Sequence, residues 1–172
     1  MMKNVNYFKA GFAVLLAVYG IILAGDVTEP RFLDRVDLVV HEAGHLLFTW
    51  FGEFIMVTGG TVLQLAVPAG IAVYFYLRRE LFSSSVAIFW VGQSLFNVSV
   101  YIKDAQAMAL PLVSVGGGDD TIHDWNYLLL KLNLLRWDQA IGNAVHVLGV
   151  LVLISSVVLG FYFSFDREET TA

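Results

Sequence analysis

The feature that most constrains this chain is a series of long apolar segments. A helix that crosses a bilayer needs about 20 mostly apolar residues, because each residue rises about 1.5 Å through a hydrocarbon core of about 30 Å. We therefore expect an all-α, polytopic membrane helix bundle with about five spans, or four if the second and third segments form a re-entrant pair. The segments run from about 8 to 24, 33 to 51, 61 to 77, 84 to 102 and 140 to 163.

Composition supports a membrane protein. Hydrophobic residues make up 58% of the 172-residue chain and charged residues only 15%, against about 25% charged in typical globular proteins. A soluble fold of this length cannot hide so much apolar surface, whereas lipid accepts it. The length fits one domain. We expect a single membrane-embedded domain over 1–172, a multi-pass protein of the cell membrane of a prokaryote with the lipid bilayer as a partner.

The charged residues and the absence of cysteine exclude several functions. The sequence has no stripe of basic residues of the kind that binds nucleic acid, so we expect no nucleic-acid partner. With five alternating spans, the 10 Lys and Arg residues divide equally between the two sides, so the positive-inside rule gives no orientation. The chain has no cysteine, which excludes disulfides, thiolate ligands and cysteine nucleophiles. A metal ion would have to be held by His, Asp or Glu.

Glycines and tryptophans predict how the segments are divided. Gly52-Glu53 is one place where the second segment can end or bend, but the pair Gly59-Gly60 favours the break there. A short apolar stretch over 125–135 follows the fourth segment. It is bracketed by Trp125 and Trp137, as is typical of the membrane interface. We therefore predict a re-entrant or interfacial helix before the last span.

The second segment carries the motif His41-Glu42-Ala43-Gly44-His45. Residues four apart lie on one face of a helix, so both imidazoles can reach a single ion. Glu42 lies beside that face, where it can take a proton from a metal-bound water and pass it to the leaving amine. Placing an ionisable residue in the hydrocarbon core costs free energy, so such a residue within a membrane segment indicates a functional site. The motif predicts a zinc-dependent hydrolase with Glu42 as general base.

A catalytic zinc ion has three protein ligands as a rule, so the motif lacks one. Asp104, at the end of the fourth segment, is one candidate, and an interfacial charge paired with Lys103 is the alternative. His123 is the second candidate, in a glycine-containing loop where Asp119, Asp120 or Asp124 can also reach a metal. Asp37, one helical turn before His41, either orients its ring or is a solvated carboxylate.

Asn97 lies in the fourth segment. An amide there can hold an extended substrate backbone or stabilise an oxyanion. The alternative is an ordinary hydrogen bond between helices.

The motif in an early hydrophobic helix resembles that of the site-2 protease family of intramembrane zinc metallopeptidases. The resemblance implies zinc on His41 and His45, an aspartate from a later helix as the third ligand, and Glu42 as the base. It also implies cleavage of a peptide bond of a membrane-protein substrate within or beside the bilayer. The family's later motif contains asparagine and proline and ends in Leu-Asp-Gly; here only Asn97 and Asp104 correspond to it.

Two other functions remain open at this point. The same activated water can attack a lipid or another small amide, which makes a zinc-dependent membrane hydrolase. A non-catalytic zinc-binding membrane subunit is the third hypothesis, although a structural site needs ligands rather than a base such as Glu42. The sequence does not determine the oligomeric state.

Overall fold

The computed structural model describes residues 4–25, 31–110 and 123–165. Secondary structure in these ranges is helical, apart from one isolated antiparallel bridge between Val5 and Phe165. In chain order the elements are α1 (Tyr7–Gly25), α2 (Phe32–Phe48), the 3₁₀ turn η1 (Thr49–Phe51), α3 (Glu53–Leu77), α4 (Leu81–Lys103), α5 (Asp124–Lys131), the 3₁₀ turn η2 (Leu135–Trp137) and α6 (Asp138–Tyr162). The all-α prediction is confirmed.

Within the described residues, four helices are long and apolar enough to cross a membrane: α1, α3, α4 and the segment Leu135–Tyr162, which contains α6. They identify the chain as an integral membrane protein. The expected span over 33–51 corresponds to α2, which has 17 residues and carries Asp34, Arg35, Asp37 and Glu42. This helix is too short and too charged to count among the four. A fifth span therefore stays a prediction.

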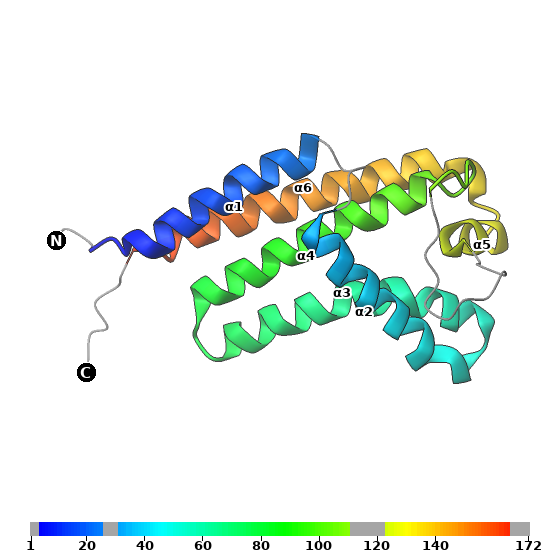
Figure 1. The fold of residues 1–172 in the computed structure, drawn as a ribbon, viewed down its shortest axis with the longest axis horizontal. Helices are drawn as coiled ribbons and strands as arrows, with labels where there is room; N and C mark the ends of the chain where they lie inside the picture. Colours follow the sequence, from blue (N-terminus) through cyan, green and yellow to red (C-terminus); the bar gives the residue numbers. More distant parts are fainter. Residues whose placement is uncertain (1–3, 26–30, 111–122, 166–172) are drawn as a thin grey trace.

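Helix α4 is the centre of the bundle. It packs between α3 and α6, and α1 lies against α6 and α4 (Figure 1). The buried apolar side chains at this centre are Phe89 and Phe96 of α4, Leu153 of α6 and Leu23 of α1. A Cβ atom at Gly149 would lie only 2.8 Å from the Phe96 ring. Small residues thus let α4 and α6 approach closely, as is usual for helices in membranes.

The break between the second and third segments lies at Gly52, and the prediction of a break at Gly59-Gly60 is wrong. Gly52 has φ +89°, a conformation that suits a residue without a side chain. Gly59 and Gly60 are buried inside α3, where they form the surface on which α2 packs. A Cβ atom at Gly44 of α2 would collide with the carbonyl of Gly59. The glycines therefore serve close helix packing, not chain reversal.

The two ends of the bundle differ (Figure 1). The bridge between Val5 and Phe165 brings the N-terminal and C-terminal parts together at one end. At the other end lie the junction of α4 with α6 and the short helix α5. Asn126 Nδ2 donates to the carbonyl of Ala105 at 2.7 Å, and Tyr127 Oη donates to Glu53 Oε2 at 3.0 Å. These bonds attach α5 to α4 and α3. Its position relative to the bilayer stays a prediction.

Candidate metal centre

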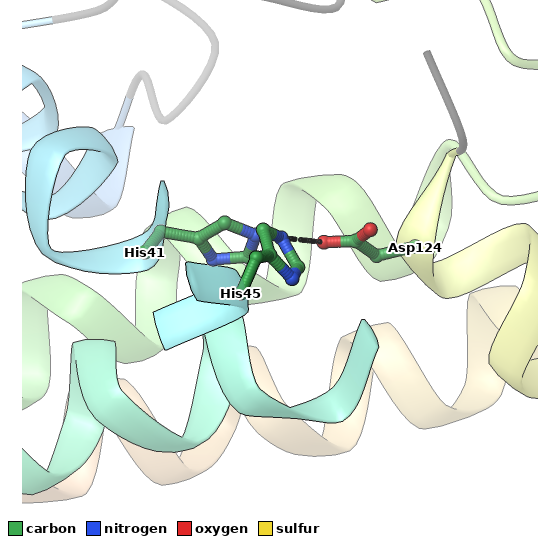
Figure 2. A group of neighbouring side chains, drawn as sticks. All are labelled: His41, His45 and Asp124. Atoms are coloured by element: carbon green, nitrogen blue, oxygen red, sulfur yellow. Dashed lines mark hydrogen bonds and ion pairs between the residues drawn. The ribbon is translucent and has the colours of Figure 1, made fainter. Parts of the chain in front are cut away.

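The two histidines of α2 meet the first residue of α5. His41 Nε2 lies 2.7 Å and His45 Nε2 lies 3.0 Å from the same oxygen, Asp124 Oδ2. Figure 2 shows both rings directed at this carboxylate. Among the described residues, these three form a group that can hold a metal ion, with one ligand atom from each residue and all ligand atoms within 4.8 Å of one another.

The other nitrogen of each ring faces an acceptor. His41 Nδ1 lies 3.0 Å from Gln64 Oε1, and His45 Nδ1 lies 2.9 Å from the backbone carbonyl of Met56. Because an amide oxygen or a carbonyl only accepts, each Nδ1 is the donor. This pattern of outer hydrogen bonds is the one that metal-binding histidines show, since it fixes the ring and directs Nε2 at the ion.

The electrostatics of the site pair the Asp124 carboxylate with a protonated His45 ring, whose proton a metal ion would displace on binding. Burial alone would raise the pKa of Asp124, but hydrogen bonds with His41 and His45 outweigh burial and hold that pKa below its usual range. The hydrogen bond with Asp124 raises the pKa of His45 to about 9, against the effect of burial and with help from the Met56 carbonyl and the charge of Glu42. The carboxylate is thus ionised, as a metal ligand must be. The side chains of His41, His45 and Asp124 remain 18%, 20% and 16% exposed.

The residues present fit a zinc ion. Two imidazoles and one carboxylate are a donor set that catalytic zinc uses. Space for an ion comes from Gly60 of α3, where a Cβ atom would lie 2.6 Å from His41 Nε2 and 2.7 Å from His45 Nε2. Any other residue at this position would fill the space in front of both coordinating nitrogens. Gly60 therefore belongs to the site, although nothing in its sequence context distinguished it from the neighbouring glycine.

Glu42, the predicted general base, lies on α2 between the two histidines. It is partly exposed, and within the described ranges it forms no hydrogen bond or ion pair. Its negative charge nevertheless acts on the His45 ring. In the described part of the chain, Glu42 is thus a carboxylate without a fixed partner beside two candidate ligands.

Asp104 and His123, the two predicted candidates for the third ligand, lie against each other and outside this group. His123 Nε2 donates to Asp104 Oδ2 at 3.2 Å. Burial raises the pKa of Asp104, but hydrogen bonds from the backbone N–H groups of Ala109 and Leu110 and from His123 outweigh burial and lower it. In the structure Asp124 faces the motif histidines in their place. Asp119 and Asp120 lie outside the described residues.

Asn97 forms hydrogen bonds between helices, which is the alternative considered from the sequence. Asn97 Oδ1 accepts from Gln64 Nε2 at 2.9 Å, and Asn97 Nδ2 donates to Asp34 Oδ1 at 3.2 Å. The amide joins three helices, while its role in substrate binding stays a prediction.

Asp37 does not hydrogen-bond to His41. Its Oδ1 accepts from Trp90 Nε1 at 2.8 Å and from Ser94 Oγ at 3.1 Å. Burial raises the pKa of Asp37 to about 6, although hydrogen bonds from Trp90, Ser94 and Gln64 act in the other direction. The partner of His41 is Gln64, a residue that sequence reasoning missed. One feature of the sequence could have identified Gln64: it is a glutamine in an otherwise apolar span. Burying a polar side chain in the membrane costs free energy, so such a residue indicates a functional role.

Comparison with protein-family models, with curated proteins and with solved structures finds no match for this chain.

Proposed function

We propose that this protein is an intramembrane zinc metalloprotease, similar to the site-2 protease family, that hydrolyses peptide bonds of membrane-protein substrates in the cell membrane of a prokaryote. The observation that carries the proposal is the convergence of His41 Nε2 and His45 Nε2 on one oxygen of Asp124. Glu42, the residue next to His41, stands beside them with no hydrogen-bonding partner in the described part of the chain. This combination supplies three ligands and a base, which is what zinc peptidases need.

The residues divide the chemistry among them. His41, His45 and Asp124 hold the ion. When bound, zinc polarises the attacking water and the carbonyl of the scissile bond. Glu42 accepts a proton from the water as its oxygen bonds to the carbonyl carbon, and then donates a proton to the amide nitrogen as the carbon–nitrogen bond breaks. The products are a carboxylic acid and an amine, and Glu42 returns to its starting state.

The distribution of polarity on α2 supports a site at the edge of the bilayer. Its outer face exposes Val39, Leu46 and Leu47, at 68%, 71% and 58%, whereas its inner face carries Asp37 and the motif histidines. Lipid would cover the outer face at little cost. We therefore propose that α2 enters the bilayer without crossing it, as one arm of a re-entrant pair with the first turns of α3, and that α5 is interfacial.

Proteolysis is tested with the full-length protein in vesicles of phosphatidylethanolamine and phosphatidylglycerol, mixed with a set of single-span peptides. We expect zinc-dependent cleavage, detected as new termini by mass spectrometry. Glu42→Gln should abolish cleavage and retain one zinc ion per chain. Glu80→Gln is the matched control, because Glu80 is an exposed carboxylate at the far end of α3. A parent protein that binds zinc and cleaves none of the peptides would contradict proteolysis.

The same vesicles report on the two other functions. Loss of phospholipid with intact peptides would favour a lipid hydrolase, and no change in either would favour a non-catalytic subunit. One apolar cavity of about 420 Å³ lies between α1, α3 and α4, and its lining includes Tyr19, Phe75, Phe89 and Trp90. None of its lining residues belongs to the metal centre. This cavity therefore gives no support to an acyl chain bound at the zinc ligands.

A further inference from the structure

His41 and His45 depend on different kinds of outer partner. To bind an ion through Nε2, a neutral imidazole must carry its proton on Nδ1. The Nδ1 of His45 faces the Met56 carbonyl, a backbone group that can only accept. The Nδ1 of His41 faces the side-chain amide of Gln64. An amide has an accepting end and a donating end, and if it turned over its NH₂ group would face His41 and favour a proton on Nε2.

A chain of hydrogen bonds through four further residues determines which way the Gln64 amide faces, and its interaction with the Asp37 carboxylate acts in the same direction. Gln64 Nε2 donates to Asn97 Oδ1 at 2.9 Å. The Asn97 amide is oriented in turn, because its Nδ2 donates to Asp34 Oδ1 at 3.2 Å. Asp34 is an aspartate held by the Gln93 amide at 2.8 Å and by the backbone N–H of Arg31 at 2.7 Å. All three partners of Asp34 are N–H donors, so its oxygens accept in each bond and set the direction of the hydrogen bonds that lead to Gln64.

Burial makes the alternative orientation costly. Gln64 is only 2% exposed and Gln93 only 1%, so a reversed amide could not exchange its lost partners for water. Reversal at Gln64 would place NH₂ against a ring nitrogen and bring two oxygens together at Asn97. Buried polar groups without matching partners are strongly disfavoured. The carboxylate of Asp34 thereby acts on His41 across two amides and three helices.

We propose that Asp34, Asn97 and Gln64 are positioning residues that hold the proton of His41 on Nδ1 and so keep Nε2 available for the metal ion. The metal-binding part of this inference rests on the proposed function, while the position of the proton does not. His45 is the internal reference, since its acceptor belongs to the backbone and cannot turn over.

The test uses the full-length protein labelled with ¹⁵N in the rings of its four histidines, in lipid nanodiscs, with and without added zinc. The ring ¹⁵N shifts report whether Nδ1 carries a proton. In the parent protein we expect a protonated Nδ1 at both His41 and His45. In Asn97→Leu, a fraction of His41 should lose that proton and His45 should not change. The zinc dissociation constant, measured by chelator competition, should rise roughly tenfold to a hundredfold.

A second substitution separates orientation from packing. Gln64→Glu replaces the amide by a carboxylate that accepts at both oxygens, so its direction no longer matters. Added to Asn97→Leu, it should restore the protonated Nδ1 of His41 and most of the zinc affinity. Ser99→Ala is the control on the same helix, because among the described residues the buried Ser99 hydroxyl bonds only to the Phe96 carbonyl within α4. It should change neither readout.

Two results would overturn the proposal. One is an Asn97→Leu protein whose His41 Nδ1 stays protonated and whose zinc affinity is unchanged. The other is a loss of affinity that Gln64→Glu does not restore and that is accompanied by shifts at His45, which would mean that Asn97 acts through packing. A parent protein that binds no zinc would contradict the proposed function, whereas the proton on His41 would still be measured in the absence of metal.

Discussion

Two clusters of histidine and aspartate lie close together in the chain's fold and differ in what surrounds their polar atoms. In the candidate metal centre, two ring nitrogens meet one oxygen of Asp124, and the three side chains are 16–20% exposed. In the second cluster, His123 and Asp104 are 3% and 9% exposed. The oxygens of Asp104 accept from the backbone N–H groups of Ala109 and Leu110, at 3.0 Å each, as well as from His123.

The difference shows that the same residue types can be arranged in different ways. In the second cluster a single ring nitrogen, His123 Nε2, faces Asp104, whereas two ring nitrogens converge on Asp124. His123 Nδ1 accepts from the backbone N–H of Asn126 at 3.2 Å, at the start of α5. This cluster instead joins the end of α4 to the residue before Asp124. We interpret it as a clasp, defined by Asp104 and His123, that holds the third candidate ligand in place.

The largest effect should come from removing a ligand. His45→Ala takes away one of the two coordinating imidazoles, so zinc affinity should fall by more than the roughly hundredfold that losing an outer hydrogen-bond partner can cost. His123→Gln, in the clasp, should still bind one zinc ion per chain. Metal content after dialysis against a weak chelator measures both. Equal loss of zinc from the two variants would contradict the distinction between the clusters.

The space in front of the imidazoles can be filled without touching a ligand. Gly60→Ala introduces a Cβ atom 2.6–2.7 Å from both coordinating nitrogens, so zinc affinity should fall at least tenfold. Overpacking of this kind also destabilises a protein by roughly 1–3 kcal/mol. Gly70→Ala is the matched control in the same helix, since nothing lies within 4 Å of the added atom. Chelator competition and thermal unfolding compare the two. If both variants bound zinc like the parent, the ion would not lie at Gly60.

Loosening the clasp should weaken the site without removing it. Asp104→Asn keeps an acceptor but loses the charge that holds two backbone N–H groups and His123. The start of α5 should then exchange its amide hydrogens faster, and zinc affinity should fall by about tenfold, as for other outer-partner changes. Asp138→Asn is the control, because it alters a buried carboxylate that contacts Gln106 and Gln139 instead. Complete loss of zinc from Asp104→Asn alone would indicate that Asp104 is itself a ligand.

The smallest effect should come from Tyr127→Phe, which removes the hydrogen bond between α5 and Glu53. This bond is exposed, so water can replace it and its loss should change stability little. Zinc affinity should change by less than threefold, measured by the same competition assay. A larger loss than in Asp104→Asn would mean that the contact with α3, rather than the clasp, holds Asp124.

Much of the fold could be predicted from apolar length alone. The expected segments over 8–24, 84–102 and 140–163 correspond to α1, α4 and α6, with ends that differ by a few residues. The break between α2 and α3 was misplaced because a pair of glycines is ambiguous. It can reverse a chain, or it can admit a neighbouring helix, and only the packing of Gly44 on Gly59 distinguishes the two.

Only the part of the site that lies on α2 could be predicted from the sequence. Spacing on α2 was enough to bring His41 and His45 to one face. Asp124 was one of several acids in the right region, and its selection depends on the fold, since it is 79 residues from His45 and needs the clasp to reach it. Asp37 lies one turn before His41, yet it faces Trp90 and Ser94 of α4 while His41 faces α3. A stripe on one helix can thus meet two different neighbours.

X-ray absorption at the zinc edge of the purified full-length protein tests the central claim most directly. We expect one zinc ion per chain with two imidazole nitrogens at about 2.0–2.1 Å and one carboxylate oxygen at about 2.0–2.2 Å. One imidazole should disappear from the spectrum in His41→Ala, and none in His123→Gln. A protein that retains no zinc, or a spectrum that loses its imidazole signal only when His123 is replaced, would contradict the account.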